Sequence, residues 1–285
     1  MIVTDLGKTK AVLFKSMREY AQYCKDNADK NDSSHGNDAN FHASKDFDEA
    51  MNLAIKGWEP KRLSLLSDAI ANNAEGIRIK RVRTDSAGSL SIDRYTTGQP
   101  KTLRNWKRKK EPSKRITLSI DVAENCSVDN EVFFNKAAML MAVAKLCAKQ
   151  NIQTQIIFIA SVTGKWEDAD SAYTVAWMFP VKQFNERLHP HKVGGAMHPA
   201  TFRRLTLGAI ENRGKSSAIP TFGDKPWGHG QSTNKGSRNG YLAMREVLNI
   251  ESSYHIPSAS DLELRNEDEL ARTVNRILGE VDKAL

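Results

Sequence analysis

The chain has 285 residues, of which 40% are hydrophobic and 27% are charged, and its formal net charge is +8. No apolar run approaches the roughly 18 residues that a membrane-spanning helix needs, and the amino terminus does not have the pattern of a secretory signal. The three cysteines lie far apart and form no zinc-spaced cluster with histidine. We therefore expect a reduced, cytoplasmic globular protein that does not bind membranes.

Residues 1–76 predict a helical region. Val12–Asp26 has helical periodicity, with Leu13, Met17 and Cys24 among its apolar positions. Asp46, followed three residues later by Glu49, is a capping box that starts a second helix. A third helix is expected over Lys61–Ala74.

Residues 77–115 form a basic segment of β-strands and an extended arm. This segment has thirteen Lys and Arg residues against three acids, a net charge of +10, so the rest of the chain carries −2. We expect half-buried strands at Ile77–Arg83 and Leu90–Tyr95, and an arm or edge strand at Lys101–Lys114. Such a cationic strip is what a polyphosphate backbone attracts, although Lys-rich runs also serve as solvated loops or blunted sheet edges.

The residues expected to contact nucleic acid combine Lys and Arg side chains for phosphates with Tyr and Trp rings for bases. Trp106 is the best stacking candidate because its neighbours are nearly all charged. A predicted helix, His198–Asn212, would add a second basic side. The full set is Arg78, Lys80, Arg81, Arg83, Arg94, Tyr95, Lys101, Arg104, Trp106, Lys107, Arg108, Lys109, Lys110, Lys114, Arg115, Arg203 and Arg204.

Residues 116–285 predict an α/β domain with a layered, mostly parallel sheet and flanking helices, of the von Willebrand A-like or Rossmann-like kind. Ile116–Ile120 is a strand, Glu131–Lys149 is the best helix in the chain, and Ile152–Val162 is an apolar strand buried on both faces. Together they form a βαβ unit, after which Ala172–Phe179 is another strand.

The remaining elements follow this unit in chain order. A segment rich in Gly, Ser and Asn predicts a flexible loop, since a loop of that length is usually functional or disordered. This loop covers residues 214–240. We expect a short strand at Ser253–Pro257. We expect helices at Val181–Leu188, His198–Asn212, Tyr241–Leu248 and Asn266–Leu285.

The motifs of common enzymes are missing. The first strand of the domain ends in Asp121, where von Willebrand A domains have an Asp-x-Ser-x-Ser turn that holds a divalent cation. Here the two serine positions are Ala123 and Asn125, so we expect no metal. No phosphate-binding glycine loop and no nucleophile elbow appear. The histidines occur without paired acids nearby, and they are His189, His191, His198 and His229. We therefore expect no enzyme and no cofactor.

Several stretches together resemble a family of tailed-phage and integrative-element proteins of unassigned function. The resemblance runs in order from about residue 44 to residue 215. It is carried by Phe47-Asp48-Glu49-Ala50 leading to Gly57-Trp58, by Asp93-Arg94-Tyr95-Thr96-Thr97-Gly98-Gln99-Pro100, and by His198-Pro199-Ala200-Thr201-Phe202-Arg203-Arg204-Leu205. In this chain the basic run replaces the hydrophobic tail that usually follows the Gly-Gln-Pro turn.

The resemblance implies a phage protein that works in the host cytoplasm. A basic protein of this size would suit the single-stranded-DNA-binding activator that brings a compact RNA polymerase to its middle promoters in podophages with a giant virion RNA polymerase. The first expectation is thus a phage nucleic-acid-binding protein, for single-stranded DNA above all, that recruits an RNA polymerase or a replication protein. The alternatives are a metal-free von Willebrand A-like protein-interaction module and a metal-dependent nuclease that uses Asp121, Glu124 and the histidines.

Overall fold

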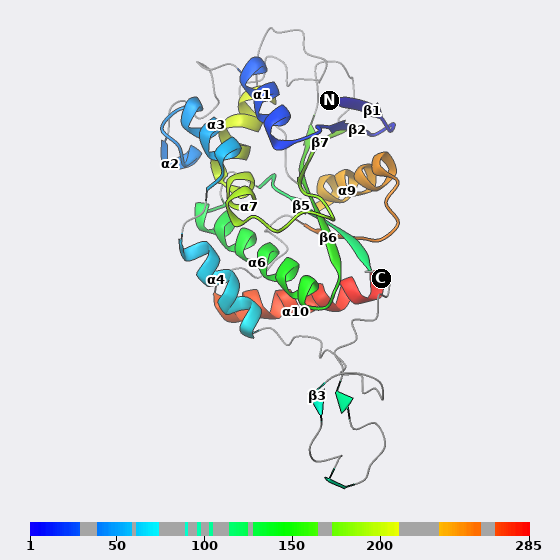
Figure 1. Ribbon diagram of the computed structural model, residues 1–285. Coiled ribbons are helices and arrows are strands. Elements are labelled where there is room, and N and C mark those ends of the chain that lie inside the picture. The colour runs from blue at the N-terminus through cyan, green and yellow to red at the C-terminus, as the bar shows by residue number, and fades with distance from the viewer. Residues whose placement is uncertain are drawn as a thin grey trace.

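Helices cover both faces of a six-stranded sheet in the computed structural model (Figure 1). The structure describes residues 1–28, 39–58, 61–73, 89–90, 96–97, 103–104, 114–124, 128–164, 173–210, 234–257 and 266–285. The layered α/β architecture confirms the expected fold class. Among the described residues, no helix is long and apolar enough to cross a membrane.

The sheet has the strand order β1-β2-β7-β6-β5-β8. Three of the five neighbouring pairs are parallel, namely β2–β7, β5–β6 and β5–β8, whereas β1–β2 and β6–β7 are antiparallel. The strands are β1 (Ile2–Asp5), β2 (Thr9–Leu13), β5 (Arg115–Asp121), β6 (Gln153–Gly164), β7 (Tyr173–Lys182) and β8 (Ser253–Ile256).

The centre of the sheet is the predicted βαβ unit. It consists of β5, α6 (Asn130–Lys149) and β6, and the two strands pair in parallel from Arg115 opposite Gln153 to Asp121 opposite Ile159. Nearly every residue of β6 is buried, because successive side chains point into two different cores. The apolar run Ile156–Ile159 therefore reports a strand covered on both faces, as the sequence predicts.

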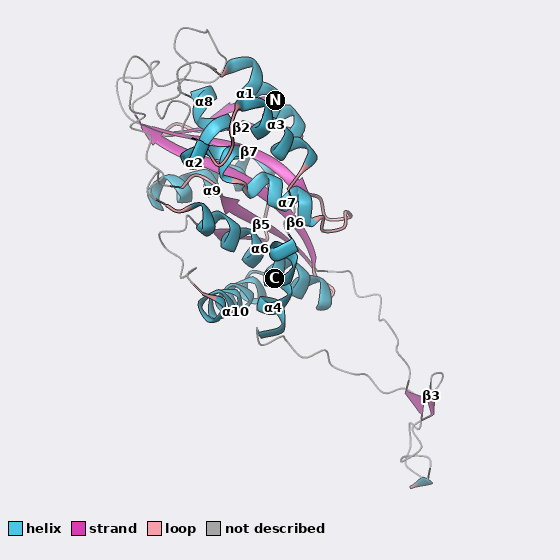
Figure 2. Cartoon of the chain, turned by 90° about the vertical axis from the view of Figure 1, so that its left-hand side faces the viewer, coloured by secondary structure: helices cyan, strands magenta, loops and turns pink. Residues whose placement is uncertain are grey.

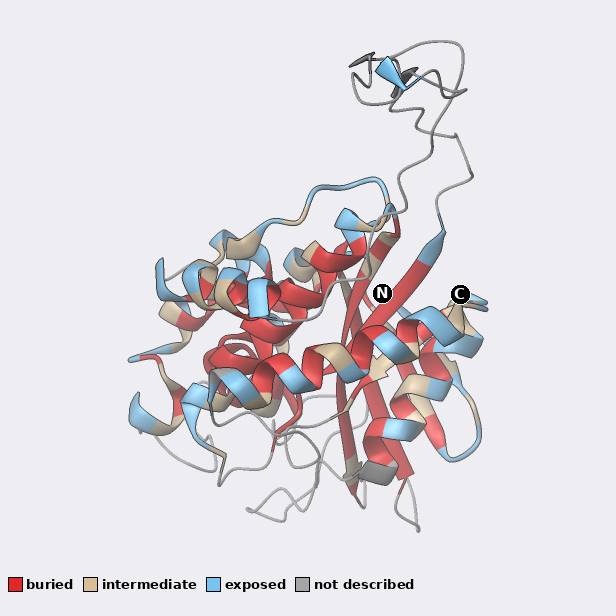
Figure 3. Ribbon diagram, turned by 90° about the horizontal axis from the view of Figure 1, so that it is seen from below, coloured by how far each residue is buried: buried red, intermediate tan, exposed pale blue. Residues whose placement is uncertain are grey.

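The two faces of the sheet are covered unequally. The helix α9 (Asn234–Leu248) covers one face, where Ala243 and Met244 pack on Ile157, Ile159 and their neighbours. The larger core lies on the other face, beneath α6, α1 (Met17–Asn27), α3 (Phe47–Lys56), α4 (Lys61–Asn73), α7 (Pro190–Met197) and α10 (Glu267–Ala284) (Figure 2). Buried residues gather on the strands and on the inner sides of these helices (Figure 3).

Two predicted helix starts are confirmed in atomic detail. The carboxylate Oδ1 of Asp46 accepts a hydrogen bond of 2.7 Å from the backbone N–H of Glu49, and Gly57 ends this helix with a φ of +86°. Asn266 caps α10 in the same way through the N–H of Glu269. Each cap satisfies a backbone donor that the first helical turn leaves free.

The amino-terminal region is not purely helical. Val12 lies in β2, and α1 begins only at Met17, after Ser16 has capped it. Because β2 pairs in parallel with β7, the strands β1 and β2 belong to the same sheet as the rest. The region expected to be purely helical, residues 1–76, therefore contributes two strands to the sheet of the α/β domain. The basic segment contributes β3 (Ser89–Leu90) and β4 (Leu103–Arg104), which form a separate two-stranded sheet.

Three further expectations need correction. The predicted helix Val181–Leu188 is wrong, because β7 continues to Lys182 and a turn follows. The predicted helix from His198 begins at Pro199, runs as a π-helix over Thr201–Thr206 (η1) and ends in α8 (Leu207–Ile210). The last residues of the expected 214–240 loop belong to α9, while residues 211–233 lie outside the described ranges.

Candidate nucleic-acid interface

Most of the residues expected to contact nucleic acid lie outside the described ranges. These are Arg78, Lys80, Arg81, Arg83, Arg94, Tyr95, Lys101, Trp106, Lys107, Arg108, Lys109 and Lys110. The backbone of Arg104 pairs with Ser89 in the two-stranded sheet. The contacts proposed for these side chains stay predictions, and the site is built below from the described residues that border them.

Lys114 and Arg115 mark the point at which the basic segment enters the sheet. Both residues are exposed. The guanidinium of Arg115 lies 5.6 Å from the centre of the Phe184 ring, and its Nε donates to Oε1 of Gln153 at 3.1 Å. The backbone oxygen of Lys114 accepts from the N–H of Gln153. The root of the basic segment is thus fixed at the amino end of β5.

A cavity of about 380 Å³ opens at the same end of the sheet. Of the described residues that line it, four are cationic and one, Glu186, is acidic. The cations come from three separate parts of the chain. They are Lys15 and Arg18 at the start of α1, Lys182 at the end of β7, and Lys192 in α7. We call this cavity the cationic pocket. The parallel pairing of β2 with β7 creates it, since both strands end there.

The cationic pocket and the root of the basic segment are close together. Lys182 is opposite Ile156 in β6, and Arg115 is opposite Gln153 in the same strand. Two strand spacings across and three residues along the sheet put their Cα atoms about 14 Å apart. Between them, Nε2 of Gln155 donates to Oε1 of Gln183 at 2.7 Å. Cations from both places therefore lie at one end of the sheet.

Three of the pocket cations have no ion-pair partner among the described residues. Lys15, Arg18 and Lys192 are exposed, and none of them forms an ion pair with the part of the chain that the structure describes. Lys182 differs, because it is buried and its Nζ donates to the backbone oxygens of Thr154 and Gln183. Burial lowers the pKa of Lys182 below its ordinary value.

Arg203 and Arg204 do not form a second basic side. Both are buried, at 4% and 7% exposure. Arg203 donates to the backbone oxygens of Phe41 and Val128 and to Oδ1 of Asn130, and it lies between the rings of Phe41 and Phe133. The guanidinium of Arg204 donates to Ser44 at its Oγ and its backbone oxygen. The expectation that these arginines contact phosphates is therefore corrected: they tie distant segments together inside the domain.

The carboxyl end of β5 holds an internal cation. Asp121 is fully buried, and its Oδ1 accepts from the backbone N–H groups of Ala123 and Ser161 at 2.9 and 3.4 Å. The ammonium of Lys136 donates to the backbone oxygen of Asp121 and to Oε1 of Glu124, each at 2.5 Å. Burial raises the pKa of Asp121 to about 6, while the charge of Lys136 acts in the opposite direction.

These residues do not fit a divalent cation of the von Willebrand A type. Ala123 offers no hydroxyl oxygen, and the ammonium of Lys136 lies where a positive charge would bind between Asp121 and Glu124. Among the residues that the structure describes, no group of three His, Cys, Asp or Glu side chains could hold a metal. Asn125 lies outside these residues.

The predicted histidine cluster does not assemble a catalytic site in the described ranges. His198 is buried against the Trp58 ring, and its Nδ1 accepts from the N–H of Ala200. The rings of His189 and His191 lie 5.5 Å apart. His229 is outside the described ranges.

A histidine that the sequence did not single out, His255, joins two serines. Its Nδ1 contacts Oγ of Ser119 at 3.0 Å and its Nε2 contacts Oγ of Ser237 at 2.8 Å. A serine paired with a histidine is the arrangement of a nucleophile and its base. Here, however, both serines are fully buried. The trio therefore joins β5, β8 and α9 inside the domain, and no substrate reaches its hydroxyl groups.

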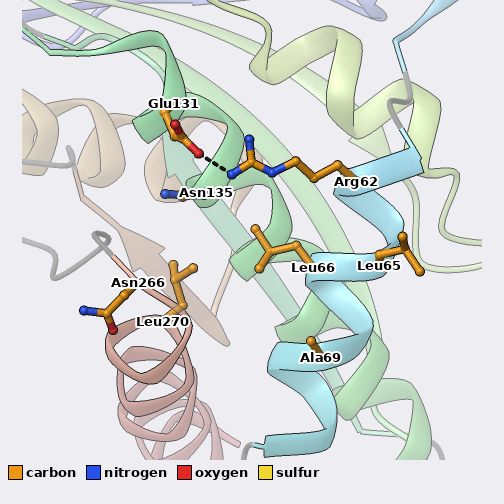
Figure 4. A pocket seen from close by; sticks show the side chains of 8 residues that line it. All are labelled: Arg62, Leu65, Leu66, Ala69, Glu131, Asn135, Asn266 and Leu270. Carbon is orange, nitrogen blue, oxygen red and sulfur yellow. Dashed lines mark hydrogen bonds and ion pairs between the residues drawn. The ribbon is translucent and has the colours of Figure 1, made fainter.

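A second cavity, of about 300 Å³, lies between α4, α6 and α10 (Figure 4). Leu65, Leu66 and Leu270 form its apolar lining, and Asn135 adds an amide. Arg62 reaches across the cavity to form an ion pair with Glu131. The charges of the described lining residues thus cancel, unlike those of the cationic pocket.

A family model with the description "Domain of unknown function (DUF7192)" matches residues 4–282. The chain belongs to the DUF7192 family. No curated protein and no solved structure matches it. The match spans β1, the basic segment and α10, so all of the cations described above lie within the DUF7192 domain.

Proposed function

We propose that this DUF7192 protein binds nucleic acid, single strands above all, as a non-enzymatic accessory factor in transcription or replication. One observation carries the proposal: exposed cations that form no ion pair with the described part of the chain gather at the end of the sheet where the basic segment joins β5. Lys114 and Arg115 lie on one side of this surface, and Lys15, Arg18 and Lys192 lie on the other.

The physical basis is the release of counterions from the phosphate backbone. Each phosphate that a Lys or Arg neutralises frees a condensed cation, so the affinity falls steeply as salt rises. The segment 77–115, which joins β5 at this surface, carries a net charge of +10. Phosphate contacts carry no sequence information, so any choice of promoter would come from a partner or from a few base contacts.

The preference for single strands rests on aromatic side chains within the basic segment. Trp106 follows Arg104 and Asn105 and precedes the run Lys107–Lys110, and Tyr95 lies before Gly98-Gln99-Pro100. Bases that are not paired can stack on such rings, with roughly 1–3 kcal/mol per stacked base. Duplex DNA hides these faces, and it would bind only through its phosphates.

Recruitment of a polymerase is a second part of the proposal. It rests on the charge and the size of the chain and on the phage origin that the resemblance implies, a combination that would suit a middle-promoter activator. A protein that holds single-stranded DNA at a melted promoter could deliver a polymerase lacking promoter affinity of its own. Retention of the phage RNA polymerase on the immobilised protein tests this part separately.

The decisive experiment is fluorescence anisotropy with labelled single-stranded and duplex DNA over a salt series. We expect tighter binding of the single strand and a steep loss of affinity with salt. Replacing Arg104, Lys107, Arg108 and Lys110 together by alanine should lower the slope of log K against log [salt] by up to about 3. Unchanged affinity and slope in this variant would refute the proposal.

A protein-interaction module is the second candidate, and the internal cation favours it. With Lys136 in place of a metal, the end of β5 keeps a fixed structure in a domain without a divalent ion. Stable capture of a protein partner, with no retention on heparin or DNA-cellulose, would favour this candidate. Cleavage of DNA that depends on magnesium or manganese would instead revive the nuclease alternative.

A further inference from the structure

The cationic pocket has the size and lining of a small-ligand site. Its volume of about 380 Å³ falls within the usual range of roughly 300–1,000 Å³ for ligand pockets. Residues at α1, α3 and α7 line it, and these helices lie on one face of the sheet (Figure 1). The walls are apolar at Met17, Ile55 and Val181.

The charges of the pocket favour an anion. Its acid, Glu186, accepts a hydrogen bond from the backbone N–H of Gln183 at 2.9 Å. The nearby Glu19 is occupied as well, since its carboxylate accepts from the amino terminus and from the backbone N–H of Lys15. The side chains of Lys15, Arg18 and Lys192 therefore stay available to a ligand. The buried Lys182 lies among them and donates to the backbone oxygen of Thr154.

The chemistry of these cations suits a phosphate. An ammonium offers three donors, and a guanidinium offers a fork that matches two phosphate oxygens. The apolar wall next to them suits a sugar and a base, and Ile55 is 37% exposed. None of the described residues that line the pocket is aromatic, so base contacts with them would be dispersive and would tolerate any base.

We propose that the cationic pocket binds one nucleotide unit, with its phosphate held by Lys15, Arg18 and Lys192 and its sugar and base against Met17 and Ile55. The inference rests on the proposed function and adds a fixed anchoring site to it. A strand that leaves the basic segment near Arg115 would reach this pocket after about 14 Å. The pocket would then hold the strand in one register along the domain.

The test begins with mononucleotides, which do not need the basic segment. Isothermal titration of the full chain with thymidine 5′-monophosphate, thymidine and inorganic phosphate separates the contributions of phosphate and nucleoside. We expect the monophosphate to bind most tightly, inorganic phosphate to compete with it, and thymidine to bind weakest. Equal binding of thymidine and its monophosphate would overturn the proposal, as would no binding of the monophosphate.

A charge-matched pair of variants locates the site. The pocket variant is Lys15→Ala, Arg18→Ala and Lys192→Ala, and the control is Lys8→Ala, Lys25→Ala and Arg238→Ala, which removes three exposed cations that do not line the pocket. All six side chains are exposed, so thermal unfolding should show both variants folded. We expect the pocket variant to weaken monophosphate binding by roughly tenfold or more and the control to leave it unchanged. Equal losses in the two variants would contradict the assignment.

The basic-segment variant Arg104→Ala, Lys107→Ala, Arg108→Ala and Lys110→Ala keeps the two proposals apart. It should lose affinity for an oligonucleotide while it still binds the monophosphate. If the pocket variant binds the oligonucleotide as tightly as the wild type, the pocket proposal fails and the proposed function stands. If the basic-segment variant also binds it unchanged, the proposed function fails on its own.

Discussion

Lys136 and Glu124 form an ion pair inside the domain, with side-chain exposures of 0% and 1%. The same ammonium donates to the backbone oxygen of Asp121, where the first strand of the βαβ unit ends. An ammonium and a carboxylate removed from water together are tolerable only because each satisfies the other. This contact joins α6 to the carboxyl end of β5 and stabilises the domain there.

Replacing Lys136 by methionine should destabilise the protein strongly. The variant keeps most of the side-chain volume but leaves the carboxylate of Glu124 and the oxygen of Asp121 buried without the ammonium. We expect the free energy of unfolding to fall by about 3–5 kcal/mol, measured by urea denaturation. The double variant Lys136→Met and Glu124→Leu should recover part of this loss. A loss below about 1 kcal/mol in the single variant would contradict the structural role.

Divalent cations should leave the stability unchanged. A metal bound a hundred times above its dissociation constant would add about 2.7 kcal/mol to the free energy of unfolding. Because Lys136 already supplies the positive charge between Asp121 and Glu124, we expect no such gain with magnesium or manganese and no loss with EDTA. Thermal unfolding in the three conditions checks this, and a clear rise with either metal would show a site that the described residues lack.

Acid should destabilise the protein through His198. Burial lowers the pKa of this imidazole from 6.5 to about 4. Between pH 6.5 and pH 4 the unfolded chain therefore binds a proton that the native protein does not, so stability is lost as the pH falls through this window. The loss amounts to up to about 3 kcal/mol. Asp121 acts with the opposite sign, because burial raises its pKa from 3.8 to about 6 and the native state favours its proton.

The variant His198→Asn isolates the contribution of the imidazole. Its amide oxygen can accept the hydrogen bond that Ala200 donates, but it does not titrate. The difference in unfolding free energy between wild type and variant should shrink as the pH is lowered from 7 to 4. If the unfolding free energies of the two proteins changed in parallel with pH, the protonation of His198 would make no contribution to the acid destabilisation.

Arg203→Ala should weaken folding without weakening DNA binding. The guanidinium is buried and its contacts join η1 to Phe41, Val128 and Asn130. We expect a loss of about 2–4 kcal/mol in the free energy of unfolding, since several buried groups lose their partner. Arg203→Lys should rescue little of this, because an ammonium does not reproduce the planar fork. At a temperature where the variant stays folded, its affinity for single-stranded DNA should equal that of the wild type, and a loss there would restore the phosphate role.

Local signals in the sequence predict local structure well. The Asp46 and Asn266 caps lie where a side-chain oxygen can reach an N–H three residues later, and this needs no other part of the chain. The α6 helix and the apolar strand β6 also follow from a periodicity and an apolar run that can be read directly. These features stabilise themselves through neighbours in sequence.

Long-range placement accounts for what the sequence does not predict. Lys15, Lys182 and Lys192 are unremarkable singly, and only the parallel pairing of β2 with β7 brings them around one cavity. From the sequence, Arg203 and Arg204 are predicted to be exposed, because no sequence pattern predicts the backbone oxygens that they bind. A buried charge depends on partners far along the chain, and periodicity does not encode them.

Strand β2 is synthesised long before β7, the strand that it pairs with in parallel. Thr9 pairs with Thr174, and 164 residues lie between the two partners. A ribosome that adds about 5–20 residues per second makes β2 roughly 8 to 33 s before β7 exists. Throughout that interval Ala11 and Val12 of β2 can pair only with β1, which was translated just before it. The hairpin of β1 and β2 therefore waits for the second half of the protein before it can join the sheet.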